Sequence, residues 1–406
     1  MPQKKTAPLR KSATKRQPKR QSQKNKTRRR NLFLALGAFF VVVVASVVIA
    51  VFAAAPRHTM DRYAYNLSEF KAKGYGRTNI ANLAGSASTS LDTGEACRKA
   101  WEAQSKMNVS YNYFCWRDSD EANGWKPQGI TGSGSAQTGA DGGNNSILLV
   151  SWYSEGRPPL AAPSQTESGA NSAARFSVVN MKTKKYRHVE LVKPCTKSAN
   201  KMCKVNSHAG GIAWAGQYLY VASTTGLYVF NVNDIYVADG KPVLPSSEWF
   251  GLNYSDKNGE MSARVSSVSF DSSANQLVTS EYRDQTSKLA TRIARWNLNG
   301  NHHLGTASRV TAASTFTLNA SSIQGIASYK GTYIANSSSE TVPGRSGRGG
   351  TLLKWRGSSS LSRYRMPYHM ESAYVDTANK RVWGMTEPGQ HSPKSFVFSY
   401  ASGVVF

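Results

Sequence analysis

The chain contains 406 residues, with 51 Lys or Arg against 24 Asp or Glu and a formal net charge of +27. Thirteen of the basic residues, and no acidic residue, fall within residues 1–30. A segment of this composition buries too little apolar surface to fold alone, which excludes a folded N-terminal domain and predicts a disordered tail. The rest of the chain has room for one large domain, because all-β folds of roughly 250 residues often stay single.

An apolar segment follows the basic tail. Residues 32–55 include no charged residue, and a helix of that length spans a hydrocarbon core of about 30 Å. We therefore predict a transmembrane helix over residues 31–55 of a single-pass cell-membrane protein. The positive-inside rule places residues 1–30 in the cytoplasm and the C-terminal domain outside the cell.

The same segment has an alternative interpretation as a signal peptide cleaved near Ala55, which would give a secreted protein. Signal peptides normally have an apolar region of about 7 to 15 residues, so the length favours a retained anchor. The basic tail is then a topology determinant that contacts anionic lipids, and nucleic-acid binding is disfavoured.

All four cysteines follow the apolar segment, where an oxidising compartment permits disulfides. Three pairings are possible. We predict the two local ones, Cys97 with Cys115 and Cys195 with Cys203, because each pair lies within one segment bounded by turn residues. A metal site is the alternative, but neither a CxxC motif nor a zinc-finger histidine spacing accompanies these thiols.

Residues 56–107 are predicted to be a linker, polar and weakly patterned as far as about Ser90. A short helix that carries Cys97 is expected over residues 95–105. Residues 108–116 are aromatic and alternating, which predicts a strand at the start of the C-terminal domain.

A unit of three antiparallel strands recurs through the rest of the chain. Its clearest copy has a short apolar strand at residues 211–214, a tight turn, and alternating strands at 218–222 and 227–232. The first strand of each unit is expected at residues 128–130, 211–213, 266–270, 324–327 and 372–375. The second is expected at 146–153, 218–222, 276–281, 331–335 and 381–385, and the third at 176–180, 227–232, 292–298, 352–355 and 396–400.

A fourth strand follows several units, at residues 187–192, 314–318 and 361–365. The last unit has no room for one before Phe406, so we expect residues 108–116 to supply it. Four-stranded antiparallel units of roughly 50 residues without helices predict an all-β fold, a β-propeller over residues 108–406. Five blades fit the repeats, and six are the alternative.

A β-sandwich is the second interpretation of the same strands. It does not explain why four aromatic residues take the same place in their third strands, namely Phe230, Trp296, Trp355 and Phe398. In a propeller we expect these side chains to pack between blades.

A ligand site is expected at the mouth of the propeller channel, beside the start of each innermost strand. The residues there are Gln128, His208, Arg264, Gln324 and Glu371. Such a set suits a divalent cation such as Ca²⁺ or a polar ligand. The alternative is that the two glutamines and Glu371 only cap backbone groups where the strands begin. No catalytic residue or metal ligand is assigned, since GxSxG, HExxH, P-loop and GxGxxG motifs are absent.

Several strings of this sequence resemble a family of secreted, functionally uncharacterised proteins of actinobacteria and related Gram-positive bacteria. They lie in order within residues 111–400, at 111–116 (YNYFCW), 125–130 (WKPQGI), 150–153 (VSWY), 185–189 (KYRHV), 208–214 (HAGGIAW), 218–222 (YLYVA), 323–326 (IQGI) and 328–331 (SYKG). The resemblance implies an exported, propeller-like domain with no agreed activity. The family pattern has an acidic pair at the start of the last repeat, whereas this chain has Glu371 followed by Ser372.

These features predict a cell-surface propeller that binds a ligand or a cell-envelope component. Subtracting the 13 charges of the tail from +27 leaves +14, which favours encounters with anionic envelope polymers or glycans. The alternative is a metal-assisted hydrolase or lactonase with Glu371 and His208 in its site. A third possibility is a scaffold whose channel is plugged by side chains.

Overall fold

The computed structural model describes residues 58–104, 112–122, 124–143, 145–154, 173–195, 198–253, 264–287, 290–340, 349–357, 360–388 and 394–401. All of them belong to the second of two compact units, residues 57–406. The predicted basic tail and transmembrane helix lie outside these ranges. Within them, no helix combines the length and the apolar character needed to cross a membrane.

The described residues are mostly β and contain five four-stranded units, which we call sheets one to five. The first two belong to one larger sheet, and the fifth repeat supplies only three of its four strands. Sheet one comprises β5 (Trp125–Gly132), β6 (Ile147–Ser154), β7 (Ala174–Asn180) and β8 (Lys185–Cys195). Sheet two comprises β10 (Ile212–Ala215), β11 (Tyr218–Ser223), β12 (Gly226–Asn231) and β14 (Lys241–Asn253). Sheet three comprises β15 (Val265–Asp271), β16 (Gln276–Glu281), β17 (Thr291–Asn297) and β19 (Ser314–Leu318).

Sheet four comprises β20 (Ile323–Tyr329), β21 (Thr332–Ser337), β22 (Thr351–Arg356) and β23 (Ser362–Arg365). Sheet five comprises β24 (Met370–Asp376), β25 (Arg381–Thr386), β26 (Phe396–Ala401) and β4 (Asn112–Cys115). The strands predicted from the repeats therefore form, with ends shifted by a few residues at most.

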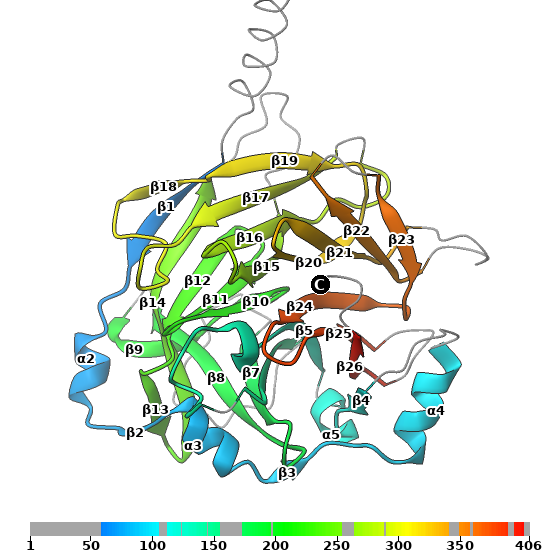
Figure 1. Cartoon of the computed structure of the whole chain (residues 1–406). Coiled ribbons are helices and arrows are strands. Elements are labelled where there is room, and N and C mark those ends of the chain that lie inside the picture. The colour runs from blue at the N-terminus through cyan, green and yellow to red at the C-terminus, as the bar shows by residue number, and fades with distance from the viewer. Residues whose placement is uncertain are drawn as a thin grey trace, which may run out of the picture. The chain divides into compact units, whose positions relative to one another are not determined.

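The five sheets form a ring. Their innermost strands, β5, β10, β15, β20 and β24, face a common centre, with the later strands of each sheet further out (Figure 1). One apolar cluster fills the space between each sheet and the next. The last of these clusters packs Ile130 and Trp152 of sheet one against Tyr374 and Trp383 of sheet five. This arrangement is propeller-like and differs from the two stacked layers of a sandwich.

The third-strand aromatics pack in these clusters. Phe230, Trp296 and Trp355 each lie opposite the second residue of the preceding strand. In sheet five this place belongs to Tyr400, and Phe398 lies two residues earlier. The predicted equivalence of Phe398 was therefore wrong, although all four equivalent rings and Phe398 are buried between sheets.

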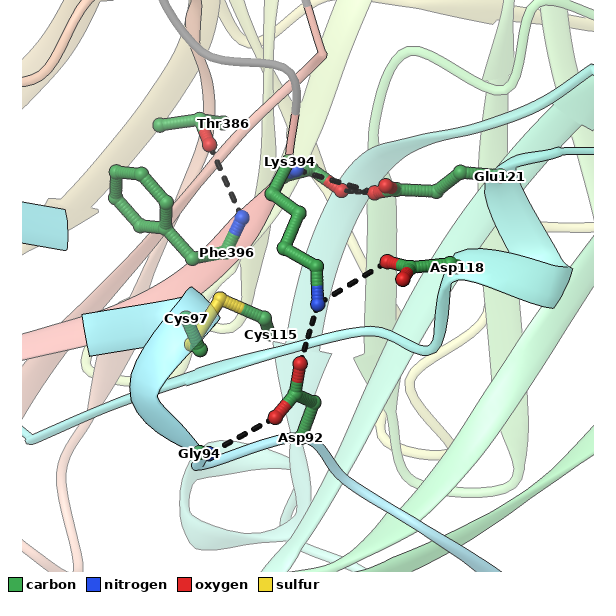
Figure 2. Close-up of a disulfide and its surroundings, with 10 residues drawn as sticks. Asp92, Gly94, Cys97, Cys115, Asp118, Glu121, Thr386, Lys394 and Phe396 are labelled. Atoms are coloured by element: carbon green, nitrogen blue, oxygen red, sulfur yellow. Dashed lines mark hydrogen bonds and ion pairs between the residues drawn. A yellow bond between two sulfur atoms is a disulfide. The ribbon is translucent and has the colours of Figure 1, made fainter. Parts of the chain in front are cut away.

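Strand β4 closes the last sheet. It pairs antiparallel with β26, which confirms the prediction that the N-terminal side supplies the missing strand. The disulfide between Cys97 and Cys115 ties β4 to helix α4 (Glu95–Gln104). Beside it, Lys394 forms ion pairs with Asp92 and Asp118 (Figure 2).

The second predicted disulfide, Cys195 with Cys203, also forms, between β8 and β9 (Ser198–Lys204). Sheets one and two share one further connection, since β14 pairs in parallel with β8 over Val243–Pro245. The two sheets are therefore hydrogen-bonded to each other as well as packed together.

Residues 58–90, expected as part of a linker, form a strap of short elements along the outside of the sheets. They comprise β1 (Thr59–Ala64), α2 (Ser68–Ala72), β2 (Gly76–Thr78), α3 (Ile80–Gly85) and β3 (Thr89–Ser90). β1 pairs with β14 and with β18 (Arg309–Thr311), β2 pairs with β13 (Ile235–Ala238), and β3 pairs with β8. Met60, Ile80 and Leu83 are buried. No element of the strap is longer than six residues, which is too short for a periodic pattern to stand out, and the sequence pattern therefore resembled a linker.

The innermost strands approach one another so closely that two glycines are required. A Cβ at Gly129 would lie 2.7 Å from the backbone nitrogen of Ile212, and one at Gly211 would lie 2.7 Å from the Cα of Ser267. Backbone atoms cannot move aside as a flexible side chain can, so a methyl group at either place pushes neighbouring sheets apart.

We expect Gly211→Ala to lower the free energy of unfolding by about 2 kcal/mol, because it overpacks the contact between sheets two and three. Urea denaturation measures the loss. Gly76→Ala is the matched control, since Gly76 is an exposed strand glycine whose Cβ would meet no atom within 4 Å. Equal stabilities for the two variants would show that the inner strands are not in tight contact.

Candidate ligand site at the start of the inner strands

Four of the inner strands carry a bulge at the same place. The register shifts between Pro127 and Ile130 in β5, between Val265 and Ser267 in β15, between Ile323 and Gly325 in β20, and between Met370 and Ala373 in β24. Bulges of this kind redirect side chains at the rims of closed sheets. The residues within the shifts include Gln128, Ser266, Gln324 and Glu371.

Three of the five predicted site residues are therefore bulge residues. In sheet three the equivalent residue is Ser266, and the predicted Arg264 lies before β15 begins. In sheet two the predicted His208 likewise precedes β10. Alternation along a strand does not reveal a bulge, because the extra residue breaks the period of two.

Glu371 is buried, with 3% of its surface exposed, and its Oε1 accepts a hydrogen bond of 3.4 Å from Gln324 Nε2. Burial raises its pKa well above the ordinary value, and the charge of the Glu387 carboxyl and a hydrogen bond with that carboxyl raise it further. Repulsion between two neighbouring carboxylates and the loss of solvation both favour the protonated form of Glu371.

Glu387 follows β25 and connects the pair to sheet one. Its Oε1 accepts a hydrogen bond of 3.2 Å from the Tyr153 hydroxyl and lies 3.4 Å from Lys126 Nζ. The Tyr153 ring in turn packs on the His208 imidazole, with ring centroids 4.1 Å apart. A continuous chain of contacts thus runs from sheet four through sheets five and one to the segment before β10.

The structure brings together His208, Gln324 and Glu371 of the predicted set, through Glu387 and Tyr153. Gln128 does not contribute in the same way, since it is buried and its Nε2 donates to the carbonyl of Pro127, 3.1 Å away. That contact matches the capping alternative for Gln128. Arg264 is exposed near Asp284, whose pKa is lowered mainly by hydrogen bonds from Thr286 and Ser287 and to a smaller extent by Arg264.

Sequence reasoning missed Lys126, Tyr153 and Glu387. It considered only the starts of the innermost strands, whereas Tyr153 and Glu387 lie at or just after the ends of second strands, β6 and β25. In an antiparallel meander the end of the second strand lies beside the start of the first. A search of both positions would have found the second acidic residue.

Two other polar clusters have structural roles. Ser177, His188 and Asp120 resemble a catalytic triad, with His188 Nδ1 2.9 Å from Ser177 Oγ and His188 Nε2 2.8 Å from Asp120 Oδ1. Ser177 is completely buried and accepts a hydrogen bond of 2.8 Å from Trp152 Nε1. Burial and, to a smaller extent, the charge of Arg175 lower the pKa of His188 to about 4. These buried polar groups are hydrogen-bonded to one another, so the network is part of the protein core. The Ser177 hydroxyl is not accessible to a substrate.

The second cluster surrounds Glu281, at the end of β16. Its Oε2 lies 2.7 Å from Arg292 Nε and 3.2 Å from the guanidinium of Arg283. Burial, with the charges of Arg292 and Arg283, lowers the pKa of the neighbouring His58 to about 4. Two guanidinium groups thus neutralise this carboxylate, in contrast to the acidic pair at Glu371 and Glu387.

The described residues do not provide the ligand set that a metal ion requires. Among the residues that the structure describes, no group of three or more His, Cys, Asp or Glu side chains is placed to hold a metal ion. The predicted Ca²⁺ site and the metal-assisted hydrolase therefore gain no support from the geometry of Glu371 and His208.

No protein-family model matches the chain, and no curated protein matches it. Among solved structures, the chain is similar to Pseudomonas fluorescens PhoX in complex with vanadate, at 9% identity over 82% of this chain and 99% of that one, with a TM-score of 0.36. It is also similar to the β-propeller domain of the Trilobed protease from Pyrococcus furiosus, at 6% identity over 66% and 64%, with a TM-score of 0.27. A third match, the Dos1 propeller, has 7% identity over 70% and 71% and a TM-score of 0.29. Similarities this low do not bear on the activity of this chain.

We expect Glu371→Gln to change how stability depends on pH. Unfolded Glu371 loses its proton near pH 4.5, whereas the folded side chain keeps it to a much higher pH. Above pH 4.5 the folded state thus holds more protons, and the free energy of unfolding of the wild type falls as the pH rises. A glutamine cannot ionise, so the variant should gain stability relative to the wild type as the pH rises above 4.5 towards the raised pKa of folded Glu371.

Urea midpoints at both ends of this range measure the effect. Glu102→Gln is the control, because Glu102 is exposed on α4 and forms a surface ion pair with Arg98. If the difference in urea midpoint between Glu371→Gln and the wild type stays constant with pH, the pKa of folded Glu371 is not raised.

Proposed function

We propose that this protein is anchored in the cell membrane by residues 31–55 and binds a polar component of the cell envelope at the carboxyl pair of its propeller-like domain. The uncharged length of residues 32–55 and the basic tail before it support the anchor. Two disulfides support an oxidising environment for the domain.

The observation that carries the binding proposal is the pair formed by Glu371 and Glu387. A protonated carboxyl donates a hydrogen bond, and a carboxylate accepts several. Tyr153, Lys126 and Gln324 add further donors around the same two groups. This combination suits the hydroxyl or amino groups of an envelope glycan, which offer both donors and acceptors. The net positive charge of the domain attracts anionic envelope polymers at longer range.

The binding proposal predicts that Glu387→Gln and Tyr153→Phe weaken capture of envelope glycans at least tenfold, because each removes a contact of the carboxyl pair. The measurement is retention of glycans, extracted from the cells that make the protein, on the full-length chain in lipid nanodiscs. Glu102→Gln and Tyr364→Phe are matched controls at exposed positions. If Glu387→Gln and Tyr153→Phe retain glycans as well as the wild type does, the carboxyl pair is not part of the binding site.

The anchor proposal predicts opposite exposure of the two chain ends in intact cells. An epitope before residue 30 should resist an added protease, whereas one after Phe406 should be removed, and both should remain with the membrane fraction beforehand. Protection of the C-terminal epitope, or its release into the medium without protease, would contradict a retained anchor with an external domain.

A further inference from the structure

Two depressions adjoin on the flank of the molecule, away from the carboxyl pair. Their volumes are about 600 Å³ and about 720 Å³, and Asn301 lines both. One wall consists of the strap residues 65–81, and residues 137–142, between β5 and β6, also line the larger depression. The other wall includes the turns at 216–218, 231–234 and 299–303. These turns lie at the opposite ends of the strands from the carboxyl pair, because β11 begins and β12 ends there. Each volume falls within the range of small-molecule sites.

We infer that these adjoining depressions form a single cleft that binds an uncharged carbohydrate. We call it the strap cleft. It is separate from the proposed site at Glu371 and Glu387, and the chemistry of its lining, the state of its charges and the fixed shape of its turns each support the assignment.

The larger depression has no charged lining residue. Amide side chains dominate it, contributed by Asn79, Gln137, Gln217, Asn233 and Asn301. His302 completes the polar set, and burial lowers its pKa, so the ring is neutral at physiological pH. An amide side chain has one acceptor oxygen and two N–H donors. Gln137 donates to the carbonyl of Ser272, and Asn233 donates to Gln217, and the remaining amide donors and acceptors complement the neighbouring hydroxyl groups of a sugar ring.

The smaller depression adds aromatic surface. The rings of Tyr65 and Tyr218 line it, and both are half-buried. The Tyr218 ring packs on His303 with centroids 4.7 Å apart, which holds it in place. Tyrosine rings combine an apolar face with a polar edge, so they can pack on the C–H face of a sugar while its hydroxyl groups stay hydrogen-bonded.

The acidic residues of the smaller depression are already paired. Glu248 lies 2.5 Å from Arg62 and 2.8 Å from His303 Nε2. Asp234 lies 2.9 Å from Arg77 and 3.5 Å from Lys71. Lys71 also lines this depression, and Asp234 is its partner. A cationic ligand would have to displace the basic partners of Glu248 and Asp234, and an anionic ligand would have to displace Asp234 from Lys71. The lining therefore favours a ligand without charge.

The turns that build the strap cleft are fixed by their own side chains. Asn299 Oδ1 accepts hydrogen bonds from the backbone of Asn301 and His303, at 2.9 and 3.0 Å. Asn231 Oδ1 accepts one from Asn233 at 3.0 Å, and Asn79 Oδ1 caps α3. A cleft whose shape is set before binding loses little entropy when the ligand arrives.

The test uses full-length protein in nanodiscs and titration calorimetry. The probes are uncharged hexasaccharides of glucose, mannose and N-acetylglucosamine, with hexagalacturonate as the acidic comparison. At least one uncharged hexasaccharide should bind, and the acidic one should bind at least tenfold more weakly. Asn301→Trp, which fills the junction of the two depressions, should weaken binding at least tenfold.

Asn112→Trp is the matched control, because Asn112 is an exposed asparagine on β4, in sheet five. It should bind like the wild type. Unfolding midpoints show whether each variant is folded, and Tyr218→Phe, which keeps the ring, should retain most of the affinity. Three results would each overturn the proposal that the strap cleft binds an uncharged carbohydrate. They are failure of all three uncharged probes to bind, preference for the acidic probe, and full affinity in Asn301→Trp.

Discussion

Packing between the first and fifth sheets closes the ring, with Trp152 set against Tyr374 and Trp383. Closure brings residues more than 200 positions apart within hydrogen-bonding distance, and the contact between Tyr153 and Glu387 is one example. The bulged inner strands then place their redirected side chains around one centre. Without closure, Glu371 would be the exposed side chain of an edge strand, with an ordinary pKa and no partner from sheet one.

Much of the fold follows from local pattern. Alternating apolar residues and well-defined turns predicted the strands of the five sheets except β14, and the missing strand of the last sheet predicted the pairing of β4 with β26. The local disulfides followed from segment boundaries. By contrast, the helices and strands of the strap are at most six residues long and show too little of a period to be predicted, although Met60, Ile80 and Leu83 are buried.

The candidate site was harder to predict than the fold, for two physical reasons. Its second carboxyl, Glu387, comes from a strand end whose position matters only once the ring closes. Gln324 and Glu371 lie in bulges, which add one residue to the strand, and in sheet three the bulge residue is Ser266, two positions after the predicted Arg264. Neither a long-range contact nor an extra residue in a strand leaves a periodic trace in the sequence.

The order in which the chain is made has a consequence for β4. This strand emerges before every other member of its sheet, yet its partner β26 is among the last segments to appear. The bond between Cys97 and Cys115 spans only 18 residues, so it can form as soon as both cysteines reach an oxidising compartment. Helix α4 and strand β4 then remain linked as one unit while the other four sheets form. Maturation should therefore end with a single late docking step at the seam, and a nascent chain stalled before Phe396 should expose an unpaired edge to chaperones and proteases.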